Sequence, residues 1–351
     1  QINIAAENLK NSKQPIIISG GGVLYSEAEE EISSFAKKHN IPVIATVMGI
    51  GCMHKDDPYY IGATGGLGEG SANNLSRDTD LALAIGTKLA DFTTASWTNF
   101  QNENFKLVSV NTSRFDTVKH RAFPVVSDAK IGLKELSKAL GDWKAPNGWY
   151  QRAIEEKIKW EEYVAKESGP TNQELPSYAH AVGAVYRNSD PSDIVVTAAG
   201  GLVGEVVQIW KPKEINTFET EWGFSCMGYE ISGALGIKMA KPDQDVVVFV
   251  GDGSYLLQNS DIYSSVLYDK KLIIVVCDNG GHMVINRLQL AKGGKEYLCN
   301  LRSANASKLQ FVDFEAHAKS MGANGETVKS IADLESAFER AKSNRAYTWN
   351  S

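Results

Sequence analysis

Cysteine is scarce in this sequence, and no paired cysteine motif is present. The 351 residues include four cysteines, which are widely separated and form no Cys-x-x-Cys pair: Cys52, Cys226, Cys277 and Cys299. Zinc ribbons and disulfide-stabilised domains need defined cysteine pairs, so this spacing argues against both classes. Unpaired cysteines are typical of a reducing compartment, and we expect a cytoplasmic location.

Long apolar runs and clusters of basic residues are also missing. No apolar run approaches the roughly 20 residues that a membrane-spanning helix needs. The formal net charge is −6 and Lys and Arg are dispersed, so we expect neither a membrane nor a nucleic acid as a partner. Small molecules that carry phosphate stay possible, because backbone amides and a metal ion can bind them without a basic surface.

Residues 15–141 alternate short β-branched runs with helical stretches. The runs lie at 16–18, 43–46, 81–85 and 106–111, and a helical pattern covers 27–39. This alternation predicts a parallel α/β sheet between helices, a Rossmann-like three-layer domain over residues 1–145. Glycines follow the first run, but Tyr25 stands where the dinucleotide-binding pattern Gly-x-Gly-x-x-Gly has its third glycine. We therefore expect no cofactor in this domain, and an NAD-linked oxidoreductase is disfavoured.

A polar stretch with several prolines and glycines separates this region from a second α/β series. We interpret residues 146–176 as the connection and residues 177–351 as a second three-layer domain. Its predicted strands are continuous apolar runs, as expected for a parallel sheet covered on both faces: residues 194–197, 216–219, 246–250 and 272–277. Glycine-rich polar loops follow all four strands, at the edge where open parallel sheets bind ligands.

Two of these loops carry the chemistry of a magnesium–phosphate site. Asp252 follows one strand within Gly251-Asp252-Gly253-Ser254, and Asn279 follows the next strand 27 positions later. Mg²⁺ prefers oxygen ligands, and a diphosphate brings its own, so a carboxylate, an amide oxygen and a backbone carbonyl can complete the coordination. Glycines at 251, 253, 280 and 281 allow close approach to phosphates, and Ser254 opens the next helix, where a hydroxyl and free amides favour an anion.

The spacing from Gly251-Asp252-Gly253 to Asn279-Gly280-Gly281 resembles the signature of enzymes dependent on thiamine diphosphate (ThDP). The resemblance implies a ThDP diphosphate- and Mg²⁺-binding domain, with Asp252, Asn279 and the Gly281 carbonyl as metal ligands. Asp278 stands where many members have a first Asn. The loop Gly200-Gly201 is similar to the family loop that contacts the diphosphate, although a plain turn is an alternative.

The segment from Trp222 to Gly228 extends the resemblance to the acetolactate synthase and decarboxylase superfamily. It implies that Met227 wedges between the two rings of ThDP and that the Ser225 carbonyl accepts a hydrogen bond from the 4′-amino group. A residue wedged there keeps ThDP bent, and the bent conformation brings the 4′-amino group near C2 of the thiazolium ring. The protein thus sets the geometry and the cofactor does the chemistry. His282, beside the metal loop, is a candidate acid or base, with a structural or solvated histidine as the alternative.

Longer stretches resemble the family of trihydroxycyclohexane-1,2-dione hydrolases, over about residues 15–342. They are Asp91–Ser96, Ser113–Asp116, Ala122–Val126, Glu219–Gly223 and Asp278–His282. The resemblance implies hydrolysis of a C–C bond in a cyclic diketone, which opens it to 5-deoxyglucuronate in myo-inositol degradation. Two alternatives stay open: an acetolactate-synthase-like lyase acting on 2-oxo acids, and a catalytically silent binding or assembly module.

The same resemblance implies a pyrimidine-binding domain whose glutamate acts on the cofactor across a subunit interface. The sequence begins at Gln1 without that domain, so we expect a processed, cloned or cut chain and a catalytic glutamate outside it. The interface implies a homodimer or a tetramer. Near the C-terminus we expect one more apolar strand before Tyr347-Thr348-Trp349, with a deletion or a missing segment there.

Overall fold

The computed structural model describes residues 1–304, 308 and 311–344. The expected strand near Tyr347 lies outside these residues. The chain forms two compact units, one of residues 1–166 with 211–216 and the other of residues 167–210 with 217–351. Within the described residues no helix is long and apolar enough to cross a membrane.

The first unit is built on a six-stranded parallel sheet with the order β3-β2-β1-β4-β5-β6. Its strands are β1 (Pro15–Ser19), β2 (Val43–Ala45), β3 (Tyr60–Ala63), β4 (Leu81–Ile85), β5 (Lys106–Asn111) and β6 (Phe123–Val126). Its helices are α1 (Ile2–Asn11), α2 (Gly21–Tyr25), α3 (Glu29–His39), η1 (Val47–Gly49), α4 (Gly70–Asp78), α5 (Asp91–Thr94), α6 (Arg114–Thr117), η2 (Lys119–Arg121), α7 (Ala129–Leu140) and α8 (Asn147–Glu167). The predicted Rossmann-like class is confirmed.

The strand order of this sheet reverses between β1 and β4, where open parallel sheets form a crevice. The loops after these two strands pack directly on each other. A methyl group built on Gly20 would lie 2.4 Å from the Gly86 carbonyl oxygen, and one on Gly22 would lie 2.6 Å from Gly86 Cα. Gly86 has φ +61°, so glycines on both sides let the two backbones touch at this point.

The boundary of the first unit differs from the sequence prediction. Most of the predicted connection at 146–176 is the 21-residue helix α8. This helix packs on the first unit, because Trp149 and Ala153 are buried in its core and Trp149 Nε1 donates to the Pro15 carbonyl at 2.9 Å. The unit therefore extends to Lys166 rather than ending at residue 145. Helix α8 is rich in charged residues and has the composition of a linker, and only Trp149 and Ala153 of its residues are buried.

The second unit has a four-stranded parallel sheet with the order β10-β9-β7-β8. Its strands are β7 (Ile194–Thr197), β8 (Phe218–Thr220), β9 (Val246–Gly251) and β10 (Ile273–Cys277). Its helices are α9 (Tyr178–Arg187), α10 (Leu202–Ile209), α11 (Tyr229–Ala240), α12 (Asp252–Leu257), α13 (Ser260–Leu267), α14 (Met283–Ala291), η3 (Leu301–Ser303), α15 (Phe314–Ser320) and α16 (Ile331–Ser343). All four predicted strands are present, and the predicted three-layer class is confirmed.

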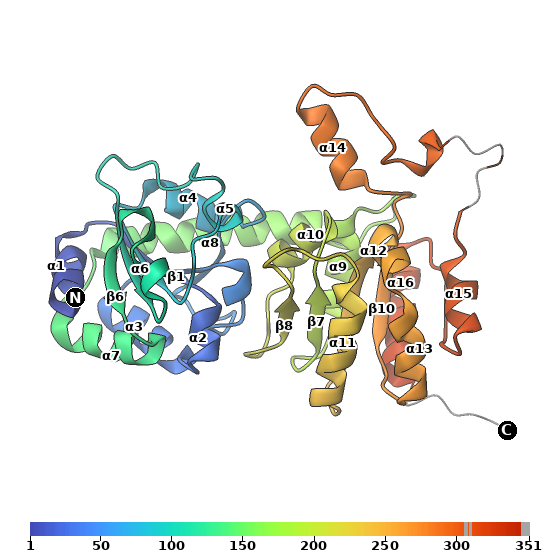
Figure 1. Ribbon diagram of the computed structural model, residues 1–351, viewed down its shortest axis with the longest axis horizontal. Coiled ribbons are helices and arrows are strands. Elements are labelled where there is room, and N and C mark those ends of the chain that lie inside the picture. The colour runs from blue at the N-terminus through green and yellow to red at the C-terminus, as the bar shows by residue number, and fades with distance from the viewer. Residues whose placement is uncertain (305–307, 309–310, 345–351) are drawn as a thin grey trace. The chain divides into compact units, whose positions relative to one another are not determined.

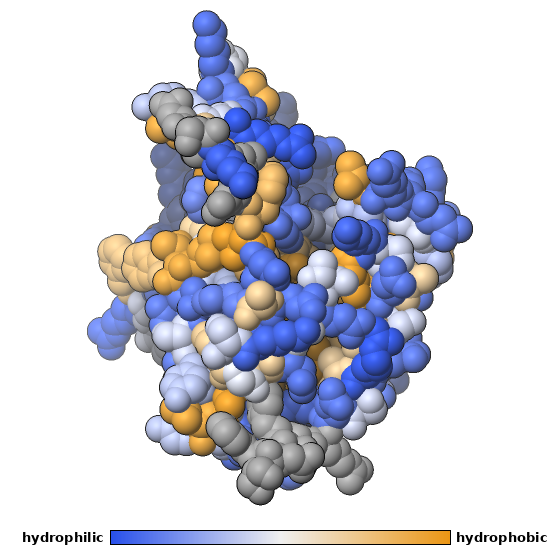
Figure 2. All heavy atoms as spheres, turned by 90° about the vertical axis from the view of Figure 1, so that its right-hand side faces the viewer, coloured by the Kyte–Doolittle hydropathy of each residue, from blue (hydrophilic) through white to orange (hydrophobic). Residues whose placement is uncertain are grey.

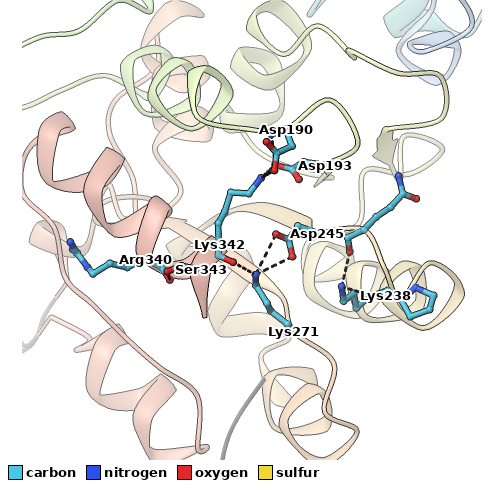
Figure 3. A network of polar contacts seen from close by, with 10 residues as sticks. Asp190, Asp193, Lys238, Asp245, Lys271, Arg340, Lys342 and Ser343 are labelled. Atoms are coloured by element: carbon cyan, nitrogen blue, oxygen red, sulfur yellow. Dashed lines mark hydrogen bonds and ion pairs between the residues drawn. The ribbon is translucent and has the colours of Figure 1, made fainter. Parts of the chain in front are cut away.

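Ion pairs hold the amino-terminal edge of the second sheet (Figure 3). Lys342 of α16 reaches Asp193, which precedes β7, and Asp190, each at 2.6 Å. Lys271, which precedes β10, pairs with Asp245 before β9 at 3.1 Å and donates to the Lys342 carbonyl at 2.9 Å. Asp193 before β7 and Asp245 before β9 are therefore both neutralised by lysines, which limits the cost of burying their charge.

Strand β10 lies at one edge of the second sheet and pairs with β9 alone among the described residues. Beside it is a hollow of about 1420 Å³, lined by β10, α15 and α16. A band of apolar residues crosses the face turned to the viewer in Figure 2. Tyr178, Cys277 and Asp278 also line this hollow, but Asp252 does not.

Candidate functional site

The carboxyl-terminal edge of the second sheet gathers the four loops that the sequence singled out. Because all the strands are parallel, the segments that follow β7, β8, β9 and β10 leave the same edge. Cys277 of β10 pairs with Gly251 of β9, so Asp252 and the loop from Asp278 begin at the same level of the sheet. The predicted metal and phosphate loops are therefore neighbours.

Asp252 is buried and linked to the neighbouring loop. Its side chain is at the start of α12, 4% exposed, and its Oδ2 accepts a hydrogen bond from the Gly281 amide at 2.7 Å. Burial raises the pKa of the Asp252 carboxyl, with the Gly281 amide opposing this shift and the Asp278 charge adding to it. A cation bound next to Asp252 would offset this desolvation and favour the carboxylate.

Asn279 is exposed and oriented by a tyrosine that the sequence analysis did not identify. Asn279 Nδ2 donates to the hydroxyl of Tyr178, which starts α9 and in turn donates to the Cys277 carbonyl at 3.4 Å. Burial raises the pKa of the Tyr178 hydroxyl, so it stays neutral. Among the described residues Asn279 Oδ1 has no hydrogen-bond partner, so the amide oxygen is the atom available to a metal ion.

The Gly281 carbonyl, the third predicted protein ligand, accepts a hydrogen bond from the Met283 amide at 3.0 Å. A carbonyl oxygen has two lone pairs, so this contact leaves room for one more partner. Gly280 and Gly281 have φ +77° and +136°, which only glycine adopts readily. The predicted glycines at these positions are therefore required by the backbone path of the loop.

The loop after β8 is held by Glu221, another residue that the sequence analysis did not assign. Its two carboxylate oxygens accept from the Phe224 amide at 2.9 Å and the Cys226 amide at 2.6 Å. Ser225 lies between them with φ +54°, a left-handed conformation that is unusual outside glycine. Its hydroxyl donates to the Ala198 carbonyl at 3.0 Å, so this loop is tied to the loop after β7.

Met227 and His282 meet at Gly253. A methyl group built on Gly253 would lie 2.7 Å from His282 Cε1 and 3.4 Å from Met227 Cε. Any larger residue at 253 would displace the imidazole, which explains the glycine between Asp252 and the buried Ser254. Met227 is 38% exposed and His282 is exposed, so both can reach a bound molecule.

The loop after β7 presents unpaired amides. Gly200 has φ +81°, and no residue in the described part of the chain accepts a hydrogen bond from the amide of Gly200 or Gly201. The guanidinium of Arg287 in α14 lies against Gly201, because a methyl group built there would be 2.8 Å from Arg287 Nη2. Two free amides and one arginine suit an anion. Arg287 was missed because nothing in its local sequence connects it with a loop 86 residues earlier.

These features fit magnesium diphosphate rather than a metal ion alone. In the described residues no group of three or more His, Cys, Asp or Glu side chains could hold a metal ion. A metal at Asp252 would therefore depend on Asn279, a backbone carbonyl and oxygens brought by the ligand, as Mg²⁺ does with phosphates. Methyl groups built on Gly200, Gly251 and Gly280 would contact nothing within 4 Å, so the backbone is open to a ligand at these three points.

Comparisons with known proteins support ThDP as the cofactor. Residues 2–136 match the thiamine pyrophosphate enzyme central domain. Residues 198–348 match the thiamine pyrophosphate enzyme C-terminal TPP binding domain. The second match includes every predicted site residue from Gly200 to His282, and thiamine pyrophosphate is another name for ThDP.

Several curated relatives share one name, 3D-(3,5/4)-trihydroxycyclohexane-1,2-dione hydrolase. The protein of Halalkalibacterium halodurans is 34% identical over 98% of this chain and 58% of its own length. That of Bacillus licheniformis is 35% identical over 96% of the chain and 56% of its own length. That of Listeria monocytogenes serotype 4b is 36% identical over 97% of the chain and 57% of its own length.

The chain thus spans a little more than half the length of the relatives that it matches. The two family domains follow each other in the order of the two units that the structure describes. The chain belongs to the thiamine pyrophosphate enzymes, of which it carries the central domain and the C-terminal ThDP-binding domain.

Proposed function

We propose that this chain supplies the central and cofactor-binding domains of a ThDP- and Mg²⁺-dependent hydrolase. Its substrate would be trihydroxycyclohexane-1,2-dione, which it would open to 5-deoxyglucuronate in myo-inositol degradation. The observation that carries the cofactor part is the meeting of Asp252, Met227 and His282 around Gly253 at one sheet edge. The name shared by the curated relatives supports the substrate.

Each of the predicted site residues has a separate role in this proposal. Asp252, Asn279 and the Gly281 carbonyl would hold Mg²⁺, and the amides of Gly200 and Gly201 would hold the diphosphate, with Gly251, Gly253 and Ser254 beside it. Met227 would support the bent cofactor, and the Ser225 carbonyl would face its 4′-amino group. Bound ThDP supplies an electron sink for breaking a C–C bond next to a carbonyl. His282 would move a proton to or from the substrate.

The first experiment is to follow the absorbance of trihydroxycyclohexane-1,2-dione with the protein expressed from its complete gene. We expect consumption only when ThDP and Mg²⁺ are both present, and a product heavier than the substrate by one water. EDTA should abolish the reaction, because no cluster of three acidic, His or Cys ligands in the described residues retains a metal by itself. Turnover of pyruvate without turnover of the dione would instead assign a lyase acting on 2-oxo acids.

Replacement of Asp252 tests the metal site. We expect Asp252→Ala to weaken ThDP binding in the presence of Mg²⁺ about a hundredfold or more, which corresponds to about 2.7 kcal/mol. Isothermal titration calorimetry measures the affinity, and circular dichroism checks the fold. Asp245→Ala is the matched control, because Asp245 precedes the same strand β9 at its other end. Equal ThDP affinity of the Asp252→Ala and wild-type proteins would refute the metal assignment.

Replacement of His282 separates proton transfer from binding. His282→Gln should lower kcat for the dione about a hundredfold, since a positioned acid or base contributes at least this factor. The dissociation constant for ThDP should change little, because glutamine leaves the Gly281 and Asp252 contacts in place. His54→Gln, at an exposed histidine of the first unit, serves as the control. An unchanged kcat in His282→Gln would remove His282 from the mechanism.

We also infer a homodimer or a tetramer. The segment from α14 to η3 exposes large apolar side chains: Ile285 (46%), Leu288 (53%), Leu290 (52%), Tyr297 (70%) and Leu298 (63%). In Figure 1 α14 stands away from the sheet of its unit. Several large apolar side chains exposed on one segment favour association. Light scattering on the eluting protein should give two or four chains, and a monomeric mass at micromolar concentration would contradict the inference.

A further inference from the structure

Glu230 lies at the centre of the loops that the proposed function assigns to the cofactor. It is in the first turn of α11 and is 0% exposed. The described residues provide no lysine, arginine or histidine as an ion-pair partner for it, and burial raises the pKa of its carboxyl. A buried acid without a counter-ion is costly unless its oxygens accept hydrogen bonds.

The carboxylate of Glu230 contacts three different loops of the sheet edge. Oε1 accepts from the Ala199 amide at 3.2 Å, in the loop after β7. Oε2 accepts from the Gly228 amide at 2.8 Å, at the end of the loop after β8. The Ser254 side chain, which follows β9, forms a further hydrogen bond. One side chain thus connects the segments that follow three of the four strands.

A local capping role explains only part of this pattern. Gly228 is the N-cap of α11, and an acid in the first turn of a helix often accepts the amide of its N-cap. Ala199 and Ser254, however, are 31 and 24 positions away from Glu230 in the sequence. A residue needed only for the helix cap has no reason to reach them.

The contact with Ala199 also decides which amides face a ligand. The Ala199 amide is directed to Glu230, and the chain then turns through Gly200 at φ +81°. The next two amides, of Gly200 and Gly201, are left without partners among the described residues. A fixed amide followed by a left-handed residue therefore leaves consecutive free donors, which is an arrangement that binds anions.

We propose that Glu230 is a positioning residue that fixes the three loops in the conformation that binds magnesium ThDP. The proposal rests on the proposed ThDP site. It assigns to Glu230 no contact with substrate or with the reacting atoms of the cofactor. Its loss should weaken cofactor affinity more than it weakens the fold.

The test compares three variants of the full protein: Glu230→Ala, Glu230→Gln and Asp193→Asn. Calorimetry gives the dissociation constant for ThDP at saturating Mg²⁺, and thermal unfolding of the cofactor-free protein gives the stability. Asp193→Asn is the matched control, because Asp193 is also a buried acid (3% exposed) next to β7, but it lies at the opposite end of that strand. Both acids are buried in the same unit, so both replacements should lower the melting temperature.

We expect Glu230→Ala to raise the dissociation constant about tenfold or more. Glu230→Gln should raise it less, because a single amide oxygen replaces one of the two acceptors, and its kcat at saturating ThDP should stay near the wild-type value. Asp193→Asn should leave the dissociation constant within about twofold of wild type. If Glu230→Ala does not fold, the dissociation constant of Glu230→Gln is compared with that of Asp193→Asn instead.

Two results would overturn the proposal while leaving the ThDP site intact. One is an unchanged dissociation constant in the deciding Glu230 variant. The other is an equal rise in Asp193→Asn, which would mean that affinity simply follows stability. Failure of the wild-type protein to bind ThDP would be a different outcome, because it would refute the proposed function itself.

Discussion

Parallel pairing of the four strands β10-β9-β7-β8 is the constraint on which the site depends. In a parallel sheet every strand ends at the same edge, and the connecting helices return the chain to the other edge. Asp252 and Asn279 are 27 positions apart, yet the register of Cys277 with Gly251 starts their loops at one level. A shift of one residue between β9 and β10 would move the side chains of β10 to the opposite face of the sheet and displace its loop along the strand direction.

The parts of the fold that the sequence predicted are those where burial alone dictates the pattern. Strands β1, β4, β7 and β9 are continuous apolar runs because helices cover both sheet faces. Strands β3 and β6 were missed. Gly62 interrupts β3 and packs against the Glu69 carboxylate, and Pro124 lies in β6, an edge strand where a missing amide is tolerated. Helix α8 was interpreted as a connection because its sequence is mostly polar. Only two of its residues, Trp149 and Ala153, are buried.

For the site, the sequence predicted the residues within motifs but not the residues that orient them. Asp252 and Asn279 stand within motifs whose glycines and spacing are visible in the sequence. Glu230, Tyr178 and Arg287 act on segments that are distant in the sequence, and their own neighbours give no sign of it. Glu230 was still traceable in one respect, because a carboxylate in the first turn of an otherwise apolar helix needs donors from elsewhere. Sequence motifs identify groups that meet the ligand, whereas the groups that orient them depend on tertiary contacts.

The charges of the second sheet differ between its two edges. At the amino-terminal edge, lysines neutralise the aspartates (Figure 3). At the carboxyl-terminal edge, the acids accept backbone amides instead: Glu221, Glu230, Asp252 and Asp278. Like charges repel each other, so these carboxylates oppose the approach of a diphosphate. Arg287 adds one positive charge beside Gly201. In the proposed site a divalent cation at Asp252 would add further positive charge, which would let the phosphates and the loop-ordering carboxylates share this edge.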